Sequence, residues 1–336
     1  MSADGPGDSR MEWLIGSLFF TASSCRQAQD GLCGQAYHSS DGICADSLNP
    51  ELPKIWYFQG LPKLGGRRFE RLPLPRSKRR ILLMNTPILL HEITREKARE
   101  LAPQTLLVLP VGAVEQHGPH LPVGTDFLTV EHVARGAAEQ AREQISVLVA
   151  PTLPFGSSHH HLSFGGTLSL STETYYRALF DLGESMVISG FRSLVLINGH
   201  GGNHELIQLV ARDLAIKHDI RFAAMSYWTV AWDALVEEGA HLNGNLPGHA
   251  GFYETSQIMA LRPDLVVEPL PHREGDQGSD PRSFYGPYRS EKHRFLEDLD
   301  GYTDSPDRGD AERGKAYLAA VIRSLGQAFV EFHKSG

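Results

Sequence analysis

Short apolar runs alternate with amphipathic segments along most of the chain after residue 84. Apolar runs of strand length are typical of strands buried on both faces, and apolar spacings of three and four residues indicate helices. The predicted buried strands are Leu106 to Val111, Val147 to Pro151, Ser193 to Asn198 and Arg221 to Tyr227. The predicted helices are His91 to Leu101, Thr125 to Gln144, Thr172 to Ser189, Asn203 to His218, Glu254 to Leu261 and Arg313 to Phe332.

This alternation of strands and helices predicts the fold class. It is typical of repeated βαβ units, which form a mostly parallel sheet covered by helices on both faces. We therefore expect an α/β fold, and we expect its functional site in the loops beyond the carboxyl ends of the strands.

The first 83 residues differ from the rest because they mix Gly, Ser, Asp and scattered apolar residues without clear periodicity. They end in a basic stretch from Arg67 to Arg80. We interpret residues 1–83 as an N-terminal extension, disordered or loosely packed, ahead of one domain over residues 84–336. An alternative is that Met84 is the natural start and that the preceding residues are upstream sequence read in frame.

Composition narrows the class of protein. The 336 residues are 41% hydrophobic and 21% charged, which is ordinary for a globular protein with a full core. A net charge of −8 argues against a nucleic-acid partner. The three cysteines, Cys25, Cys33 and Cys44, form no paired framework, which favours a cytoplasmic protein. The apolar stretch from Trp13 to Ala22 is too short to span a bilayer, so we expect no membrane partner.

A first group of polar residues follows the strand at Leu106. Glu115 and His117 are two residues apart, which in an extended segment puts both side chains on one side, and Asp126 opens the next helix. Two carboxylates and an imidazole in strand-to-helix loops could form a divalent-metal site. The plainer alternatives are that Asp126 is a helix cap and that Glu115 is a solvated loop residue.

A second group lies in the glycine-rich turn from Asn198 to Asn203, between the strongest strand and a helix. Such a turn can bind phosphate through backbone N–H groups, but the sequence has neither a G-x-G-x-x-G fingerprint nor a P-loop. The other interpretation is that the glycines let the backbone bend so that His200 points into a site at the end of the strand.

Two further groups carry histidines. His249 lies in a loop, and Glu254 begins a helix five residues later. The segment from Phe155 to His161 ends in three consecutive histidines, whose side chains point in different directions in an extended loop. We expect His159 and His160 at the surface.

Six segments, in this order and spacing, resemble the creatininase family (creatinine amidohydrolases). They are Leu109–His120, Gly124–Asp126, Phe164–Leu170, Asn198–Asn203, Ser226–Trp228 and His249–Ser256. The resemblance runs from about Met84 to the C-terminus and does not include the extension.

The resemblance implies a three-layer αβα sandwich that holds two divalent metal ions, with zinc first and manganese or iron as alternatives. Glu115, Asp126 and His200 would hold one metal. His117 and Asp126 would hold the other, with Asp126 bridging the two. Creatininase itself completes its second metal with a glutamate where this chain has Gly202, and we expect Glu254 to replace that ligand.

The resemblance also suggests an activity, in which metal-activated water attacks a C–N bond of a small polar cyclic or amide substrate. His249 would protonate the leaving group or hold the developing charge. Trp228, Ser157 and His161 would contact the substrate.

Other classes of function stay open. Creatinine itself is disfavoured, because Gly201 stands where creatininase has a tyrosine. Alternatives are a hydrolase of a lactone or an oxidised inositol, a peptide-precursor peptidase, and a non-catalytic metal- or phosphate-binding protein. Members of the family form homo-oligomers, commonly hexamers.

Overall fold

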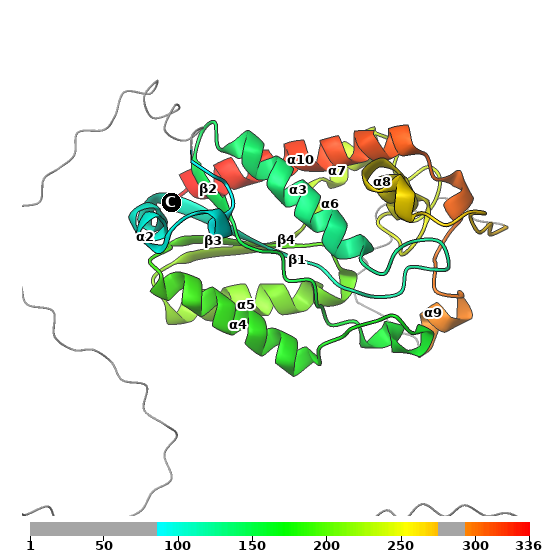
Figure 1. The fold of residues 1–336 in the computed structure, drawn as a ribbon, viewed down its shortest axis with the longest axis horizontal. Helices are drawn as coiled ribbons and strands as arrows, with labels where there is room; N and C mark the ends of the chain where they lie inside the picture. Colours follow the sequence, from blue (N-terminus) through cyan, green and yellow to red (C-terminus); the bar gives the residue numbers. More distant parts are fainter. Residues whose placement is uncertain (1–85, 275–292) are drawn as a thin grey trace, which may run out of the picture. The chain divides into compact units, whose positions relative to one another are not determined.

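The structure is a computed structural model that describes residues 86–274 and 293–336. The predicted extension over residues 1–83 lies outside the described residues. The described part of the chain contains a four-stranded sheet with the strand order β2-β1-β3-β4, in which every pairing is parallel (Figure 1). The strands are β1 (Thr105–Val111), β2 (Ser146–Val149), β3 (Ser193–Asn198) and β4 (Arg221–Ser226).

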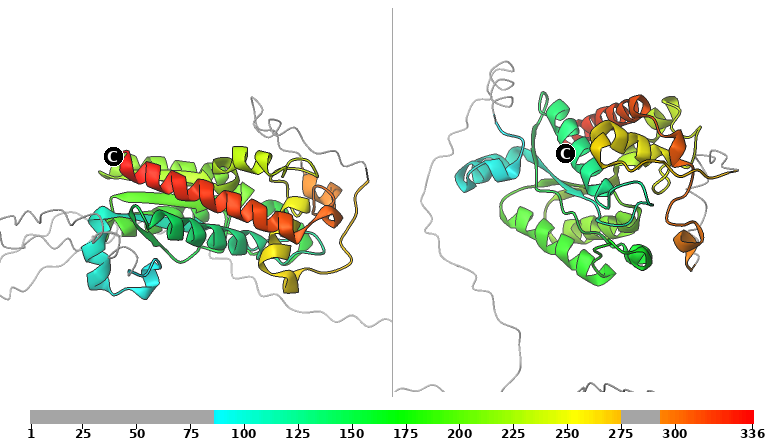
Figure 2. Two further views of the ribbon diagram at one scale, coloured as in Figure 1. Left: turned by 90° about the horizontal axis from the view of Figure 1, so that it is seen from above. Right: turned by 45° about the vertical axis from the view of Figure 1, so that its right-hand side comes forward.

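Helices cover both faces of this sheet. On one face lie α3 (Thr125–Ala141) and α10 (Ala311–Lys334), and α4 (Thr172–Ile188) and α5 (His204–Lys217) lie on the other (Figures 1 and 2). The predicted α/β sandwich with a parallel central sheet is therefore confirmed.

The period of two in β1 explains how one strand serves both layers. Leu106 and Val108 pack in the core beneath α3 and α10, whereas Leu107 and Leu109 pack in the core beneath α4 and α5. Because successive strand residues point to opposite faces, a strand buried on both faces needs apolar residues throughout. All seven residues of β1 are buried.

The remaining elements connect these layers. One of these elements has a side-chain cap, in which Thr94 Oγ1 accepts from Lys97 N–H, and Asp310 Oδ1 caps α10 in the same way by accepting from Arg313 N–H. The remaining elements are η1 (Leu90–Glu92), α2 (Arg95–Leu101), η2 (Ala102–Gln104), η3 (His159–Phe164), η4 (Gly201–Asn203), α6 (Tyr227–Val230), α7 (Trp232–Glu237), α8 (Phe252–Leu261), η5 (Pro263–Leu265), α9 (Phe295–Asp298) and η7 (Pro306–Arg308).

The sequence placed several boundaries wrongly. The predicted helix from His91 is two elements, because Ile93 and Thr94 are extended between η1 and α2. The predicted helix from Asn203 begins instead as a single 3₁₀ turn at Gly201. Helix α8 begins at Phe252, which places Glu254 inside its first turn.

Asp126 is not a helix cap. Helix α3 begins at Thr125, its N-cap is Gly124, and no side chain caps its first turn. The Asp126 carboxylate is 4% exposed and faces two histidines. The buried environment of the sheet edge, not the helix end, therefore determines where this side chain points.

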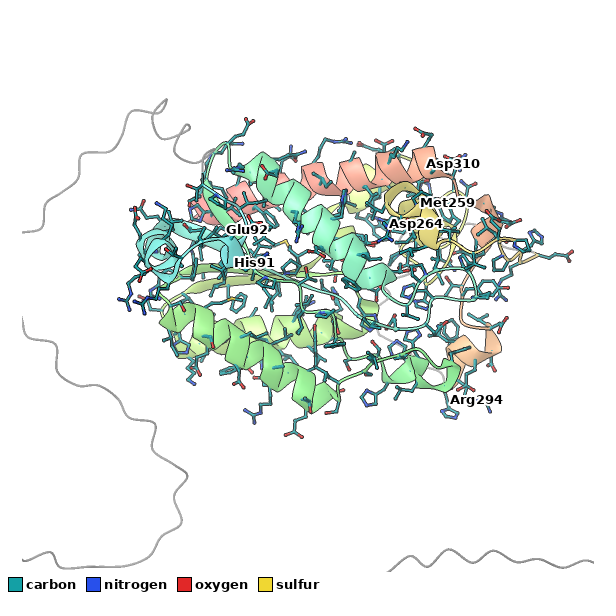
Figure 3. The ribbon with its side chains drawn as sticks, in the orientation of Figure 1. His91, Glu92, Met259, Asp264, Arg294 and Asp310 are labelled. Carbon is teal, nitrogen blue, oxygen red and sulfur yellow. The ribbon has the colours of Figure 1, made fainter. Side chains whose placement is uncertain are left out.

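The carboxyl ends of the strands converge on one end of the domain. Val111, Asn198 and Ser226, the last residues of β1, β3 and β4, lie in register. Figure 3 shows the labelled Asp264 and Arg294 toward this end and His91 and Glu92 at the opposite end. Among the described residues, no helix combines the length and apolarity that crossing a membrane requires.

Candidate metal centre and active site

The loops that follow β1 and β3 bring the predicted ligands together. Asn198, the last residue of β3, holds the glycine-rich turn, because its side chain accepts from His200 N–H at 3.0 Å and donates to His200 O at 2.6 Å. Asn203 then ties this turn to the β1 loop by donating to Gly112 O at 3.1 Å. The turn therefore aims His200 at the residues that follow β1.

Glu115, Asp126 and His200 form what we call the first cluster. His200 Nδ1 lies 3.1 Å from Glu115 Oε1 and 3.2 Å from Asp126 Oδ2. Glu115, Asp126 and His200 are 0%, 4% and 3% exposed, so bulk water does not solvate the two carboxylates. The three ligand atoms lie within 4.8 Å of one another, close enough to hold one ion.

His117, His249 and Glu254 form the second cluster. His117 Nε2 lies 3.6 Å from Glu254 Oε2, and the rings of His117 and His249 have centroids 4.4 Å apart. Asp126 lies between the two clusters, since its Oδ1 is 3.1 Å from His117 Nε2 while its Oδ2 faces His200. One carboxylate thus contacts a histidine of each cluster.

The donor atoms fit divalent cations. Both carboxylate oxygens of Glu115 and Oδ2 of Asp126 are buried and accept no hydrogen bond. Buried carboxylates are strongly unfavourable unless a positive charge compensates them. His117 Nδ1 lies 3.1 Å from Glu115 O, and His200 Nε2 lies 3.2 Å from Ser157 O. Each ring thus donates to a main-chain carbonyl and turns its other nitrogen to the carboxylates, as metal-binding histidines do.

The pKa shifts express the same charge pattern. Burial alone would lower the pKa of His117, but Asp126, Glu254 and Glu115 together outweigh burial and raise it to about 10. Burial likewise opposes Glu115 and Asp126 at His200, whose pKa they hold well above its usual value. Burial raises the pKa of Glu254 to about 8, although His117 opposes the rise. Without a bound cation, protons held by His117, His200 and Glu254 therefore balance the negative charge of the carboxylates.

His249 differs from the other members of the clusters. Burial, together with the neighbouring His117, holds its pKa well below the usual range, so its ring is neutral. Its side chain is 15% exposed, more than those of Glu115 at 0% and Glu254 at 9%. His249 is therefore the member that solvent or a small molecule reaches most easily.

His161 and Gln116 complete the centre. His161 Nε2 lies 3.2 Å from Glu115 Oε1, so this ring sits against a carboxylate of the first cluster. Glu115, His161 and His249 also offer ligand atoms within 4.8 Å of one another, a third possible group. The sequence did not single out Gln116, which lies within 3.1 Å of both His161 and His249.

The residues predicted to contact the substrate do not share one location. Trp228 is 3% exposed and packs in the core beneath α3 and α10, with its ring edge-on to Tyr227. Ser157 is half-buried, and its main-chain carbonyl oxygen lies 3.2 Å from His200 Nε2. His159 and His160 are exposed, as expected. The substrate contacts of Trp228, Ser157 and His161 stay predictions.

The glycine-rich turn leaves no room for a side chain at Gly202. A Cβ there would lie 2.4 Å from Ser157 O and 2.5 Å from His200 Nε2. At Gly201, by contrast, no atom lies within 4 Å of an added Cβ. A glutamate at position 202 would thus displace His200 in this backbone, and the turn is open at position 201.

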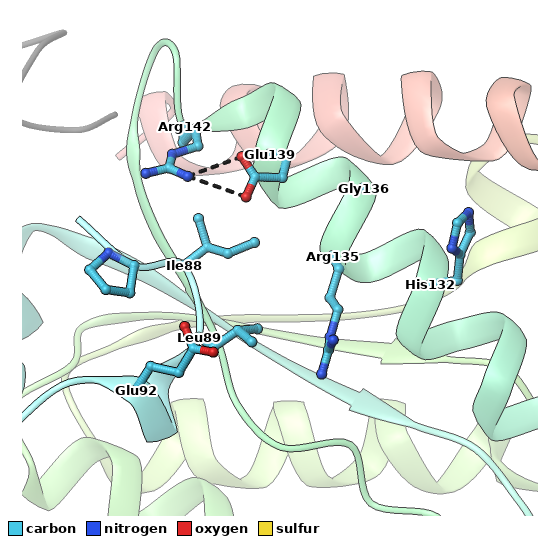
Figure 4. A pocket seen from close by; sticks show the side chains of 9 residues that line it. Ile88, Leu89, Glu92, His132, Arg135, Gly136, Glu139 and Arg142 are labelled. Atoms are coloured by element: carbon cyan, nitrogen blue, oxygen red, sulfur yellow. Dashed lines mark hydrogen bonds and ion pairs between the residues drawn. The ribbon is translucent and has the colours of Figure 1, made fainter. Parts of the chain in front are cut away.

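A separate surface pocket of about 480 Å³ lies between α3 and the segment from Pro87 to Glu92 (Figure 4). At the end of α3 on the rim of this pocket, Arg142 pairs with Glu139 at 3.0 Å (Figure 4). None of the ligand groups described above lines this pocket. This pocket is therefore separate from the two clusters.

Comparison with known proteins identifies relatives with named activities. A mycofactocin precursor peptide peptidase of Mycobacterium ulcerans (strain Agy99) is 32% identical over 166 residues, which cover 48% of this chain and 60% of the relative. A creatinine amidohydrolase of Pseudomonas putida is 35% identical over 199 residues, 54% of this chain and 75% of the relative. A 3-dehydro-scyllo-inosose hydrolase of Thermotoga maritima (strain ATCC 43589 / DSM 3109 / JCM 10099 / NBRC 100826 / MSB8) is 31% identical over 118 residues, 34% of this chain and 37% of the relative.

Solved structures agree with these relatives. A crystal structure of creatinine amidohydrolase (creatininase) superposes with a TM-score of 0.59 at 29% identity and covers 73% of this chain and 97% of its own. Matching creatininase structures include a manganese form and a zinc–zinc form of a mutant.

The family model for creatininase, described as creatinine amidohydrolase, matches residues 91–329. The match covers well over half of the chain and includes every member of the clusters. The chain therefore belongs to the creatininase family of amidohydrolases.

Proposed function

We propose that this protein is a binuclear metal-dependent hydrolase that cleaves a C–N bond in a small polar amide. The observation that carries the proposal is the pair of buried carboxylates, Glu115 and Asp126, which face ring nitrogens and accept too few hydrogen bonds. The solved zinc–zinc and manganese forms of creatininase support the choice of divalent cations.

Glu115, Asp126 and His200 would hold one cation, and His117, Asp126 and Glu254 would hold the other. Glu254 replaces the glutamate that the glycine-rich turn of creatininase supplies, since a side chain at Gly202 would collide with His200. Ala250 N–H donates to Glu254 Oε2 at 2.6 Å, which keeps this carboxylate aimed at His117.

When bound, two divalent cations lower the pKa of water and polarise a carbonyl group, so that hydroxide is available near neutral pH. His249 would accept the proton that the attacking water loses and pass it to the leaving nitrogen, because its ring is neutral and its side chain is the most exposed of the clusters. Asp126 and Glu115 fix the positions of the positive charges, and burial keeps competing water away.

A peptide-precursor peptidase is the second candidate. The match to the mycofactocin precursor peptide peptidase supports it, as does the open space at Gly201.

One experiment tests both candidates. Protein loaded with zinc or manganese is assayed against cyclic amides, lactones and short peptides, with metal-stripped protein as the control. We expect turnover of at least one amide or peptide that depends on metal. Turnover of lactones alone would contradict C–N cleavage, and no turnover at all would favour a non-catalytic metal-binding protein.

We further propose that the hydrolase domain begins near Met84, which agrees with a family match that starts at residue 91. Protein that starts at Met84 is expected to retain metal binding and activity. Cytoplasmic localisation and assembly into a homo-hexamer stay predictions, and light scattering of the purified protein measures the second.

A further inference from the structure

Gln116 lies between two predicted metal ligands and has a side chain whose orientation the surroundings fix. Gly118 N–H donates to Gln116 Oε1 at 2.9 Å, and Gln116 Nε2 donates to Gly301 O at 3.1 Å. An N–H group can only donate and a carbonyl oxygen can only accept. The amide of Gln116 therefore has one consistent orientation, with its nitrogen toward the histidines.

Two imidazole rings face this nitrogen. His161 Nδ1 lies 2.9 Å from Gln116 Nε2, and His249 Nε2 lies 3.0 Å from it. The amide nitrogen has two protons, and Gly301 O accepts one of them. One proton remains for one of the two rings.

The main chain decides which ring receives that proton. His249 Nε2 also lies 3.0 Å from Gln116 O, which can only accept, so His249 Nε2 must carry a proton and donate it there. The remaining amide proton goes to His161 Nδ1, which must be a bare acceptor. An imidazole ring whose Nδ1 is bare carries its proton on Nε2, so the proton of His161 lies on Nε2.

We infer that Gln116 is a positioning residue that sets opposite roles for two histidines of the same tautomer. In His161 the protonated Nε2 faces Glu115 Oε1 at 3.2 Å, so that atom cannot bind a cation. In His249 the protonated Nε2 faces away from the carboxylates, and Nδ1 faces Glu115 Oε1 at 3.8 Å. His249 is thus ready to accept a proton at Nδ1, a role that rests on the proposed function.

The contrast with the other rings supports this assignment. His117, His200 and His249 each place one nitrogen within 3.2 Å of a main-chain carbonyl and turn the other toward the carboxylates. His161 instead meets the N–H of a side-chain amide. Of the three possible ligand groups, the one that needs His161 Nε2 is therefore excluded, and the first and second clusters remain.

The segment around Gly301 is built to hold this arrangement. Gly301 has a φ of +77°, and a Cβ there would lie 2.4 Å from Gln116 Oε1. Two residues later, Thr303 Oγ1 accepts from His249 N–H at 2.9 Å. One segment thus fixes both the amide and the ring that it contacts.

Nitrogen NMR of metal-free protein labelled with ¹⁵N-histidine tests the inference. In the wild type we expect His161 and His249 both to be protonated at Nε2, with signals assigned through His161→Asn and His249→Asn. In Gln116→Glu, the carboxylate accepts from the ring, so we expect the His161 proton to move to Nδ1. In Gln116→Met, which has no donor, we expect a mixture of His161 tautomers.

A matched control is Gln208→Met, because the exposed Gln208 amide also contacts a histidine, His204, at 2.8 Å. This change should alter the His204 signals and leave His161 and His249 unchanged. Melting curves for each variant show whether it is folded. Wild-type protein with His161 protonated at Nδ1, or a folded Gln116→Glu variant with unchanged tautomers, would overturn the inference.

The readout separates this inference from the proposed function, because it needs neither metal nor turnover. In the loaded enzyme, Gln116→Met is expected to lower kcat by about 10–100-fold with little change in KM, the usual effect of losing a partner that orients a site residue. The expected tautomers in a protein that binds no metal would contradict the proposed function alone.

Discussion

Asp126 contacts a histidine of each cluster, and the two clusters differ in how the fold supplies their other members. The first cluster takes its residues from the ends of β1 and β3, adjacent strands in the centre of the sheet, and from the first turn of α3. The second takes His249 and Glu254 from a loop and from helix α8, outside the sheet. The first is thus determined by the strand order, and the second by how helix α8 packs.

This difference explains why the chain tolerates Gly202. A cluster built on two strand ends has little freedom, so a side chain at position 202 would collide with His200. Helix α8 can supply a carboxylate from the other side, because Ala250 N–H orients Glu254. The departure from creatininase is therefore expected to change the second cluster and to leave the first intact.

The largest expected effect comes from the residue that the clusters share. Asp126→Ala should lower metal content from about two ions to fewer than one, since both histidines that face Asp126 lose their carboxylate. Turnover should fall by at least about 1,000-fold, because each 1.4 kcal/mol of lost transition-state stabilisation costs about tenfold.

Elemental analysis and steady-state kinetics check this prediction, with Asp181→Ala as the control because Asp181 is exposed on α4. A folded Asp126→Ala protein that keeps both ions would show that the clusters do not share a bridge.

Glu254→Gln should affect the second cluster alone. The substitution keeps the shape of the side chain and removes its charge, so about one ion per chain should remain. Activity should fall by about 100-fold, a loss of about 2.7 kcal/mol of transition-state stabilisation. Metal content by mass spectrometry measures the effect, and Glu173→Gln, at an exposed position on α4, is the control. Two ions in the variant would leave Glu254 with a structural role only.

Gly202→Ala should affect the first cluster. Its Cβ would lie 2.5 Å from His200 Nε2, so His200 must shift, and the overpacking should destabilise the fold by about 1–3 kcal/mol. Gly201→Ala is the matched control in the same turn, since no atom lies within 4 Å of its Cβ. Chemical denaturation and metal titration compare the pair. Equal effects of the two substitutions would contradict the close contact at Gly202.

The smallest expected effect is a pH dependence of the Tm, which bound metal weakens. In metal-free protein the raised pKa of His117, about 10, means that the folded state binds this proton more tightly than the unfolded state. Its stabilising contribution is complete below about pH 6.5 and is lost as pH rises to about 10. The raised pKa of Glu254, about 8, acts in the same direction.

Between pH 7 and about 10, the folded protein holds protons on His117 and Glu254 that the unfolded protein has already released. The Tm of metal-free protein should therefore fall as pH rises over this range. With metal bound the fall should be smaller, since cations and protons compete for the same atoms. Calorimetry at several pH values measures both slopes. A metal-free Tm that rises over this range would contradict the charge pattern of the clusters.

Periodicity predicted the fold and the edge of the sheet at which the first cluster lies, and the family resemblance grouped its three members. The apolar runs of β1 and β3 place their carboxyl ends at one edge, and Glu115 and His200 follow directly. The grouping of His117 with Glu254 was predicted only through the family resemblance, because it depends on the packing of α8, which no local pattern encodes.

Gln116 was missed for a different reason. A strict alternation through Glu115 and His117 would turn Gln116 away from the site. The segment after β1 makes only an isolated bridge at Val114, so it is not a regular strand and all three side chains reach the centre. For Trp228 the sequence left two roles open, because an aromatic residue after β4 can line a substrate site or pack in the core, and Trp228 packs in the core.

The binuclear centre bridged by Asp126 is tested most directly by the anomalous scattering of crystals grown with zinc and measured at the zinc absorption edge. We expect two peaks, one within about 2.0–2.2 Å of Glu115, Asp126 and His200 ligand atoms and one equally close to His117, Asp126 and Glu254. A single peak, or two peaks that do not both contact Asp126, would contradict a binuclear centre bridged by that carboxylate.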